Sequence, residues 1–370
     1  MKSKNILATI KSKSLKEAKS EINQILDKLE KENADLQASK EDYQRLIQLN
    51  NHIASIFTNK VKEISSLKKN IKKKIFWKMK IKSKIKNNAK KVDIFLKKYF
   101  DKEKKTSLIK PMKYGTISGG KKIRSSIILN TGKIFNISSK KLLNICGAVE
   151  CIHSYSLIHD DLPCMDDDKI RRGRPSTHIK FNESTAVLAG NSLLTLAFEI
   201  IANKNYIVDN KTKVELIKEL ASCSGHAGVA GGQELDLSFE KKKKTFKEII
   251  NMQRKKTGKL FNFCCLSIAI YAKKNKKVKK GLSNLGEDIG LLFQLADDFI
   301  DIRGSKKHAG KIVGKDKKKG KSTLINLLGY DKAYKYAYKL KKNILRKLLK
   351  HGKKAEDLIN TVEFILGRKF

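Results

Sequence analysis

Apolar residues recur at helical spacing through the first part of the chain. A stripe begins with Leu15, Ala18 and Ile22, and it resumes after a polar turn at residues 32–35. Apolar positions separated by three or four residues are typical of an amphipathic helix that packs one face against a partner. The pattern therefore predicts an α-helical hairpin over residues 1–67, a small unit that we expect to dock or oligomerise.

The next segment, residues 68–90, has a different character. Lysines are interspersed with Ile residues and with Phe76, Trp77 and Met79. One interpretation is a basic amphipathic helix on an acidic membrane surface or on nucleic acid. The alternative, which the sequence favours, is a lysine-rich linker with a few side chains tucked onto the next domain. Met79 also marks a position at which a free-standing downstream protein could begin.

Helical spacing then continues to the end of the chain. Residues 91–370 contain no run that alternates polar and apolar positions as strands do. The last segment keeps Leu358, Val362 and Ile365 on one apolar face. Because hydrophobic residues make up 40% of the chain, there is enough material for a sizeable core. The sequence predicts one large all-α domain over residues 91–370.

The charge changes this picture only locally. The chain has 82 Lys and Arg against 37 Asp and Glu, a formal charge of +45, which is compatible with nucleic-acid binding. Lysines are spread along the whole chain with frequent Ile and Asn, residue types with A/T-rich codons, so a solvated lysine surface is the simpler explanation. Arginine is rarer, and Arg124, Arg171, Arg172 and Arg174 fall in two short segments. Arginine is preferred where a planar fork must hold a phosphate, so these segments are where chemistry is expected.

The cellular compartment follows from features that the sequence lacks. Six cysteines form no CxxC pair, which is typical of a reducing compartment. The first residues contain no apolar run long enough for a signal peptide. The most apolar stretch, from Leu260 to Ala272, is too short and too interrupted to span a bilayer. We therefore expect a soluble cytoplasmic protein without a transmembrane segment.

The strongest chemical signal is HDDLPCMDDDKIRRGRPSTH at residues 159–178, which holds five aspartates. Clustered carboxylates need cations to neutralise them, and Mg²⁺ prefers such oxygen ligands. Arg171 and Arg172 follow directly, which suits a metal and phosphate site better than a solvated acidic turn. A second cluster, FQLADDFID, places Asp297 and Asp301 on one face of a helix. Two such clusters could face each other across a bundle, each holding metal against one diphosphate.

Glycines and cations recur in three more places. GGKKIR, from Gly119, could bring backbone and cations close to phosphate, and KTG follows at residues 256–258. Residues 304–321 form a Gly/Lys loop in which five residues, rather than four, separate the glycines of GKDKKKG, and no buried strand precedes them. We therefore reject a P-loop in favour of a mobile loop whose Lys311 closes over a diphosphate.

In combination and order, these features resemble the short-chain trans-isoprenyl diphosphate synthases over residues 91–370, and bacterial farnesyl diphosphate synthases most closely. The resemblance implies an all-α, isoprenoid-synthase-type bundle around a central cavity, preceded here by the hairpin. It implies a prenyltransferase that joins isopentenyl diphosphate to dimethylallyl and geranyl diphosphates and yields farnesyl diphosphate. The alternative within this class is a geranylgeranyl or longer-chain diphosphate synthase. A terpene cyclase would not need the GGKKIR site for a second diphosphate.

The resemblance also implies a role for each motif residue. Three Mg²⁺ ions would be bound by Asp160, Asp161, Asp166, Asp297, Asp298 and Asp301. Isopentenyl diphosphate would be held by Lys121, Arg124, His153 and Arg172, and the allylic substrate would be contacted by Arg171. The catalytic groups of the allylic site would be Lys256, Thr257, Gln294 and Lys311. One departure is Ser125, which stands where the family usually has Pro.

Product length is expected to depend on the helix that precedes the first aspartate cluster. Tyr155 and Ser156 lie about one helical turn before Asp160. If this helix lines the cavity, the growing tail passes these residues, and the bulk of Tyr155 forms a floor after two condensations. A fifteen-carbon product follows from this hypothesis. In the alternative, Tyr155 packs in the core with its hydroxyl bonded to a neighbouring helix.

The segment from Ser14 to Ala54 is similar to the small subunit of exodeoxyribonuclease VII. That resemblance implies a fusion of two units and a partner, the exodeoxyribonuclease VII large subunit; the alternative is an unrelated helical extension. A second class of function would then be a nuclease accessory subunit with the synthase as a passenger, but the retained Asp, Arg and Lys motif positions argue against a passenger.

A homodimer of the synthase is also expected.

Overall fold

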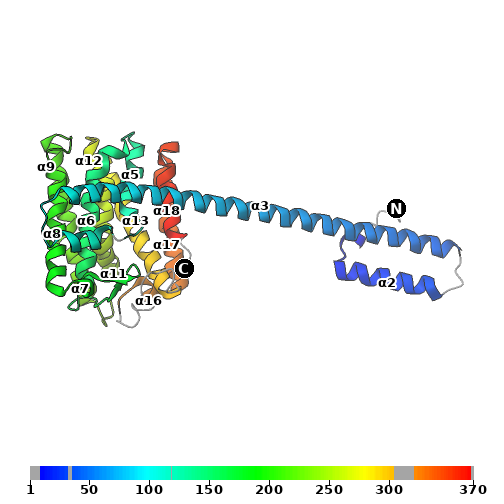
Figure 1. Ribbon diagram of the computed structural model, residues 1–370. Helices are drawn as coiled ribbons and strands as arrows, with labels where there is room; N and C mark the ends of the chain where they lie inside the picture. The colour runs from blue at the N-terminus through cyan, green and yellow to red at the C-terminus, as the bar shows by residue number, and fades with distance from the viewer. Residues whose placement is uncertain (1–8, 32–35, 118, 304–320, 368–370) are drawn as a thin grey trace. The chain divides into compact units, whose positions relative to one another are not determined.

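The computed structural model describes residues 9–31, 36–117, 119–303 and 321–367 (Figure 1). The chain divides into two compact units, Met1–Met79 and Lys80–Phe370. The boundary falls inside one helix, α3 (Leu36–Lys102), so the residues interpreted as a linker are helical. The physical reason is that α3 contains neither Gly nor Pro to end it. The domain bounds drawn from the sequence stay a prediction.

The first unit is a helical hairpin formed by α2 (Leu15–Lys31) and the first part of α3. A capping box begins α2: the Ser14 N–H donates to Glu17 Oε2 at 2.7 Å, and the Glu17 N–H donates to Ser14 Oγ at 3.3 Å. A small core of Ile10, Ala18 and Leu49 joins the helices, with Ile22, Ile25 and Ile53 packed against it. The unit therefore buries little apolar surface, as expected for so short a hairpin.

The second unit is a helical bundle (Figure 1). Its first half contains α4 (Ile109–Ile117), α5 (Ile123–Ile134), η1 (Ser139–Leu142), α6 (Leu143–Asp160), the strands β1 (Ile170–Arg171) and β2 (Arg174–Pro175), α7 (Thr177–Lys180), α8 (Glu183–Ala202) and α9 (Asn210–Ser224). Its second half contains α10 (Val229–Ser238), α11 (Phe246–Gln253), the π-helical turn η2 (Arg254–Gly258), α12 (Lys259–Tyr271), α13 (Lys276–Arg303), α16 (Leu324–Leu328), α17 (Tyr330–Leu349), η3 (Gly352–Ala355) and α18 (Glu356–Leu366). Within the described residues the only strands are these two short ones, so the all-α fold is confirmed.

The core of the bundle lies between α6, α8, α12 and α13. Helix α6 packs along α8, and α12 packs along α13. Every residue from Leu260 to Ile270 is buried, which explains why α12 has no polar face. The part of α3 in this unit adds the buried residues Ile85, Val92 and Leu96. The motif-bearing ends of α6 and α13 are thereby held on a rigid core.

Two glycines allow α13 to approach its neighbours closely. A Cβ at Gly290 would lie 2.7 Å from Gly258 Cα, and a Cβ at Gly286 would lie 2.4 Å from the Phe261 carbonyl oxygen. Any larger residue would push α13 away from η2 and α12. The approach brings the KTG turn beside the FQLADD segment of α13.

One described helix, α8, is long and apolar enough to cross a membrane by length and composition alone. Its most apolar window is 44% buried inside the bundle, where α8 packs against α6 and α9. Core helices of globular domains commonly pass the same test. The packing therefore identifies α8 as a helix of the bundle.

Candidate active site

A cavity of about 410 Å³ opens in the second unit. Most of the residues that the sequence singled out line it: Lys121, Arg124, His153, Asp160, Asp166, Arg171, Arg172, Lys256, Thr257, Gln294, Asp297, Asp298 and Asp301. Asp161 and Tyr155 are not among the lining residues, and Lys311 lies outside the described residues. The fold therefore brings both aspartate clusters and the cationic motifs to one place.

The first aspartate cluster sits where α6 ends. The Asp166 N–H donates to the Asp160 carbonyl at 2.8 Å, so the loop folds back and returns Asp166 to the cavity beside Asp160. Burial raises the pKa of Asp160 to about 6, although the nearby Lys256 ammonium opposes the shift. Asp167 is exposed and does not line the cavity. Asp168 also lines the cavity, where it is paired with Arg171, so the cluster presents three of its five carboxylates there.

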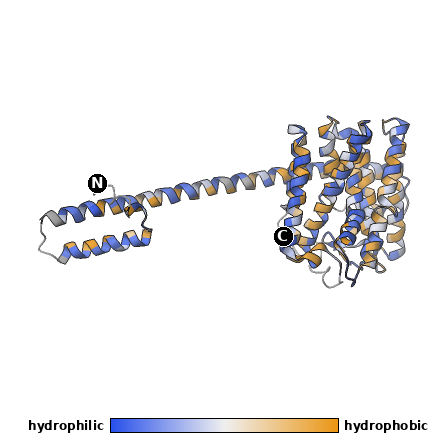
Figure 2. Ribbon diagram, turned by 180° about the vertical axis from the view of Figure 1, so that it is seen from behind, coloured by the Kyte–Doolittle hydropathy of each residue, from blue (hydrophilic) through white to orange (hydrophobic). Residues whose placement is uncertain are grey.

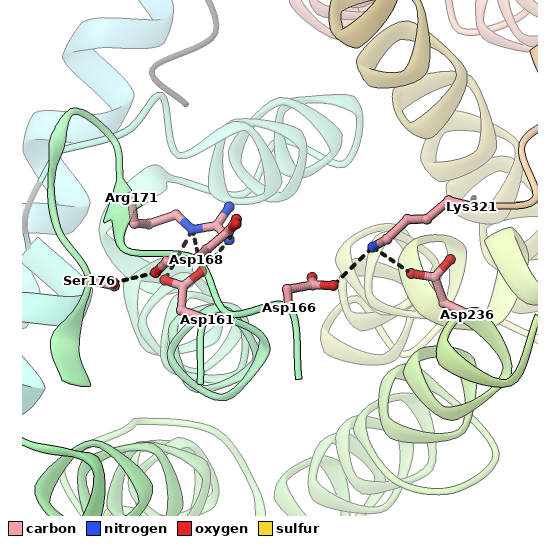
Figure 3. Close-up of polar contacts among 7 residues, drawn as sticks. All are labelled: Asp161, Asp166, Asp168, Arg171, Ser176, Asp236 and Lys321. Atoms are coloured by element: carbon pink, nitrogen blue, oxygen red, sulfur yellow. Dashed lines mark hydrogen bonds and ion pairs between the residues drawn. The ribbon is translucent and has the colours of Figure 1, made fainter. Parts of the chain in front are cut away.

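Asp161 is the one expected metal ligand that does not line the cavity. Its side chain is turned to Arg171, whose Nε donates to Asp161 Oδ1 at 2.9 Å and to Oδ2 at 3.2 Å (Figure 3). Arg171 Nη2 also donates to Asp161 and, at 3.2 Å, to Asp168 Oδ2. Asp161 is only 2% exposed. The reason is geometric, because neighbouring residues on a helix point about 100° apart and Asp160 takes the cavity side. Asp161 therefore positions Arg171 on the cavity wall.

A two-residue turn places Arg171 and Arg172. Strands β1 and β2 pair antiparallel, with Arg171 opposite Arg174. Arg172 and Gly173 form the turn with φ of 54° and 74°, as in the type I′ turns that suit tight hairpins. Arg172 Nη1 then donates to the Gly119 carbonyl at 2.9 Å. A Cβ at Gly120 would lie 3.0 Å from Arg172 Cζ, so the glycine makes room for the guanidinium.

Arg124 and His153 form the opposite, cationic part of the wall. Arg124 Nη1 lies 3.1 Å from His153 Nε2. Burial, and then the charge of Arg124, hold the pKa of His153 well below its usual range. His153 is therefore neutral and accepts the hydrogen bond from Arg124. The Arg124 guanidinium lies over the rings of Phe261 and Phe293, with Cζ 4.8 and 5.7 Å from their centroids.

Lys122 supports this motif from behind rather than from the cavity. Its side chain is 1% exposed, and Nζ donates to the Thr116 carbonyl at 2.6 Å. Nζ also lies 3.6 Å from carboxylate oxygens of Asp93 and Glu150. Ser125 Oγ donates to Glu150 Oε1 at 2.7 Å, which gives the unusual Ser125 a structural role. Of the two adjacent lysines, only Lys121 lines the cavity.

A chain of amides orients the second aspartate cluster. Thr257 Oγ1 donates to Gln294 Oε1 at 2.7 Å, and Gln294 Nε2 donates to Asp298 Oδ1 at 2.9 Å. Gln253 Nε2 donates to the other oxygen, Asp298 Oδ2, at 3.0 Å. Thr257 belongs to the π-helical turn η2, an irregularity that is frequent at functional sites. The KTG motif therefore acts partly by holding carboxylates of α13 in place.

The cavity residues to which the sequence analysis assigned no role include two that carry charge and bind each other, Asp236 on α10 and Lys321. Asp236 accepts from Lys256 Nζ at 2.5 Å. Lys321 Nζ donates to Asp236 at 3.2 Å and to Asp166 at 3.1 Å (Figure 3). Asp236 raises the pKa of Lys256 despite the opposing effect of burial. The only sequence signal was the stretch from Gln233 to Asp236, which is polar at three of its four positions and follows two glycines. A lone acid is too common to single out without the fold.

The carboxylates of the cavity suit a hard divalent cation that is bound jointly by the protein and by the phosphates of a substrate. Among the described residues, no group of three His, Cys, Asp or Glu side chains forms a ready-made metal site. Mg²⁺ is usually bound by one or two carboxylates together with waters and substrate phosphates, so it does not require such a cage. Carboxylates of both aspartate clusters face one cavity that also carries arginines and lysines.

Comparisons with known proteins agree with this arrangement. The polyprenyl synthetase family model matches residues 105–363. Farnesyl diphosphate synthase of Escherichia coli is 43% identical over 63% of this chain and 78% of the relative, and that of Bacillus subtilis is 41% identical over 61% and 77%. Geranylgeranyl diphosphate synthase of Cyanophora paradoxa is 36% identical over 75% and 93%.

Solved structures give the same result for the fold. The apo structure of an FPP/GFPP synthase from Zymomonas mobilis has a TM-score of 0.70 and 35% identity, covering 78% of this chain and 99% of that one. A geranyltransferase from Helicobacter pylori, complexed with magnesium and isoprenyl diphosphate, has a TM-score of 0.67 and 31% identity, covering 78% and 96%. The chain therefore belongs to the polyprenyl synthetase family.

Proposed function

We propose that this prenyltransferase condenses isopentenyl diphosphate with dimethylallyl diphosphate, and then with geranyl diphosphate, to give farnesyl diphosphate. The observation that carries the proposal is the pairing, in one cavity, of two aspartate clusters with a separate cationic set around Arg124 and Arg172. The first arrangement suits a metal-bound diphosphate, and the second suits a diphosphate held by cations alone. Two substrates that each carry a diphosphate need both.

The allylic diphosphate would be bound between the two aspartate clusters. Mg²⁺ would be held by Asp160 and Asp166 on one side and by Asp297, Asp298 and Asp301 on the other, and we propose three ions. When bound, Mg²⁺ would neutralise the charge that grows on the departing diphosphate. Arg171, Lys256 and Lys321 line the same part of the cavity and would contribute positive charge to that diphosphate.

Isopentenyl diphosphate would be bound by Lys121, Arg124 and Arg172. His153 contributes as a neutral acceptor that fixes the Arg124 guanidinium. Apolar side chains, including Leu157 and Met252, complete the lining and would keep water from the allylic cation once its carbon–oxygen bond breaks. The alkene of isopentenyl diphosphate then attacks this cation, and the departing diphosphate accepts the proton, so no dedicated side-chain base is needed.

We propose that the fifteen-carbon length of the product is set by the residues of α6 that precede Asp160. Ser156 and Leu157 line the cavity, whereas Tyr155 packs behind them with its hydroxyl donating to the Ser224 carbonyl at 3.3 Å. This hydrogen bond agrees with the alternative interpretation, in which Tyr155 packs in the core of the bundle. Tyr155 could still limit the cavity from below if the tail displaces Ser156. The similarity to farnesyl diphosphate synthases at 40–43% identity supports the shorter product.

We also propose that the enzyme acts as a cytoplasmic homodimer. All six cysteines are free thiols, which suits a reducing compartment. Val187 and Leu188 are adjacent apolar residues on the exposed side of α8, with exposed fractions of 38% and 53%. A second subunit would cover that face.

The N-terminal hairpin carries a separate proposal, namely binding of the exodeoxyribonuclease VII large subunit. The resemblance of the segment is supported by its hairpin form and by exposed apolar residues such as Tyr43 and Ile47. A pull-down with residues 1–78 as bait should retain that large subunit. If it does not, the segment is an unrelated helical extension of the synthase.

Metal dependence tests the proposed site. Asp297→Asn removes a cavity carboxylate on α13, whereas Asp167→Asn removes an exposed carboxylate of the first cluster and serves as the matched control. We expect Asp297→Asn to lower turnover on the order of 10²–10³-fold and to raise the Mg²⁺ concentration needed for half-maximal rate. Asp167→Asn should behave as the unmodified enzyme. Equal effects of the two variants would contradict the assignment.

A further inference from the structure

An apolar stripe runs along α3 between residues 57 and 79. It recurs every three or four positions, and each member is at least half exposed: Phe57, Val61, Ile64, Leu67, Ile71, Ile75 and Met79. Every side chain that the structure describes between residues 57 and 76 is exposed. Apolar and polar positions alternate along this helix in Figure 2. Contiguous exposed apolar surface on this scale marks an interaction site.

The rest of this helical segment is strongly basic. Lys62, Lys69 and Lys73 lie on the face opposite the stripe, as the 100° step per residue requires. Residues 57–79 contain eight lysines and one acid, Glu63. Lysine is thus about a third of the segment against about a fifth of the chain, so the general lysine richness of the protein does not account for it.

A second copy of the same helix is a poor occupant for the stripe. In a coiled coil, the heptad that contains Phe57, Val61 and Ile64 places Lys68 and Lys78 at the seam. Lys60 and Lys72 would flank that seam on both chains, and Glu63, the one acid of the segment, already pairs with Lys60 of its own helix at 2.9 Å. Like charges at these positions oppose association.

Nucleic acid explains only half of the pattern. Its phosphates would bind the lysines, but seven apolar side chains would remain in water. An anionic lipid surface accounts for both halves, since the stripe enters the region between headgroups and acyl chains while the lysines meet lipid phosphates. Lys68 and Lys78 can bury their stems and extend their ammonium groups to the headgroups.

We propose that residues 57–79 bind in the plane of an anionic bilayer surface and attach the protein to it. At 1.5 Å per residue, the segment would cover about 33 Å of that surface. The attached enzyme would release an amphiphilic prenyl diphosphate next to the phase into which its tail partitions. That consequence rests on the proposed function, whereas the binding itself does not.

The test measures co-sedimentation of the full chain with vesicles. One set contains phosphatidylcholine alone, and the other contains phosphatidylcholine mixed with phosphatidylglycerol. The stripe variant carries Ile64→Gln and Ile71→Gln, two side chains 51% and 57% exposed, so its fold should be preserved. The matched control carries Val214→Gln on α9, a side chain 65% exposed outside the stripe.

We expect the unmodified chain and the control to bind the anionic vesicles and not the neutral ones. The stripe variant should bind at least about tenfold more weakly and keep normal turnover in the absence of vesicles. Exchange of Lys69 and Lys73 for Gln should reduce the dependence on phosphatidylglycerol. Failure of turnover in all proteins would contradict the proposed function while leaving the vesicle result interpretable.

Three results would overturn the proposal. The unmodified chain could fail to bind anionic vesicles, or the stripe variant could bind them as well as the control does. A loss of oligomeric mass or of DNA affinity in the stripe variant, without a change in vesicle binding, would assign the stripe to a second copy or to nucleic acid instead.

Discussion

Comparing the Asp161→Asn and Asp160→Asn variants distinguishes a carboxylate that positions Arg171 from one that binds metal. Asp161 is 2% exposed and receives its hydrogen bonds from Arg171, while Asp160, its neighbour in sequence, lines the cavity. We therefore expect Asp161→Asn to lower thermal stability and to reduce turnover only modestly. Asp160→Asn should abolish most turnover and leave the stability nearly unchanged or slightly raised. Burial raises the pKa of both carboxyls, but Asp161 has hydrogen bonds from Arg171 that oppose this effect and that its exchange weakens.

The size of the stability effect follows from the contacts. A hydrogen bond to a charged group contributes about 1.5–3 kcal/mol, and Asn keeps one acceptor oxygen for Arg171. Arg171 also keeps its contact with Asp168, and its side chain is 24% exposed, so the lower end applies. A loss of about 1.5 kcal/mol in a domain of this size lowers Tm by roughly 3–6 °C.

The assay pairs thermal unfolding with steady-state turnover at saturating Mg²⁺. Asp161→Asn should lose no more than about tenfold in kcat/KM, because Arg171 stays on the wall but less firmly. Asp160→Asn should lose on the order of 10²–10³-fold. If Asp161→Asn lost turnover as severely as Asp160→Asn with an unchanged Tm, Asp161 would be a metal ligand and the pairing with Arg171 would not describe the working enzyme.

Three further predictions concern other parts of the chain. Because burial and Arg124 depress the pKa of His153, its imidazole NMR signals should not titrate between about pH 8 and about pH 6. The unfolded chain binds this proton and the folded chain does not, so the free energy of unfolding should fall as pH drops below about 6.5; a His153 signal titrating near its usual pKa would refute this. Tyr155→Ala should shift products to twenty carbons or more by chromatographic analysis, and an unchanged product from a folded enzyme would place the floor elsewhere. A protein that begins at Met79 should keep full kcat/KM, since among the residues that the structure describes none before Lys121 lines the cavity; a large loss in soluble protein would show that the first unit completes the site.

Residue spacing predicted the fold and much of the cavity for a definite physical reason. Periodic apolar positions specify helices, and clustered acids or cations need partners of opposite charge, so Asp160, Asp297 and Arg172 could be identified without coordinates. Lysine content alone does not distinguish a linker from a helix: residues 68–90 are helical because no Gly or Pro ends α3 there.

Side-chain direction could not be predicted in the same way. Adjacent residues at a helix end point in different directions, so Asp160 enters the cavity while Asp161 turns to Arg171. Lys121 and Lys122 divide in the same manner, one lining the cavity and one buried behind it. Asp236 lies on a helix far from either cluster in sequence, so only tertiary packing reveals it. Neither direction nor packing is encoded in spacing alone.

The central claim is that the cavity joins isopentenyl diphosphate to an allylic diphosphate and stops at fifteen carbons. The most direct measurement incubates the purified full chain with Mg²⁺, dimethylallyl diphosphate and labelled isopentenyl diphosphate, removes the phosphates and determines the carbon number of the alcohols. We predict Mg²⁺-dependent label in a fifteen-carbon alcohol as the main product. A main product of twenty or more carbons would contradict the assigned length, and a cyclised hydrocarbon without label from isopentenyl diphosphate would contradict prenyl transfer itself.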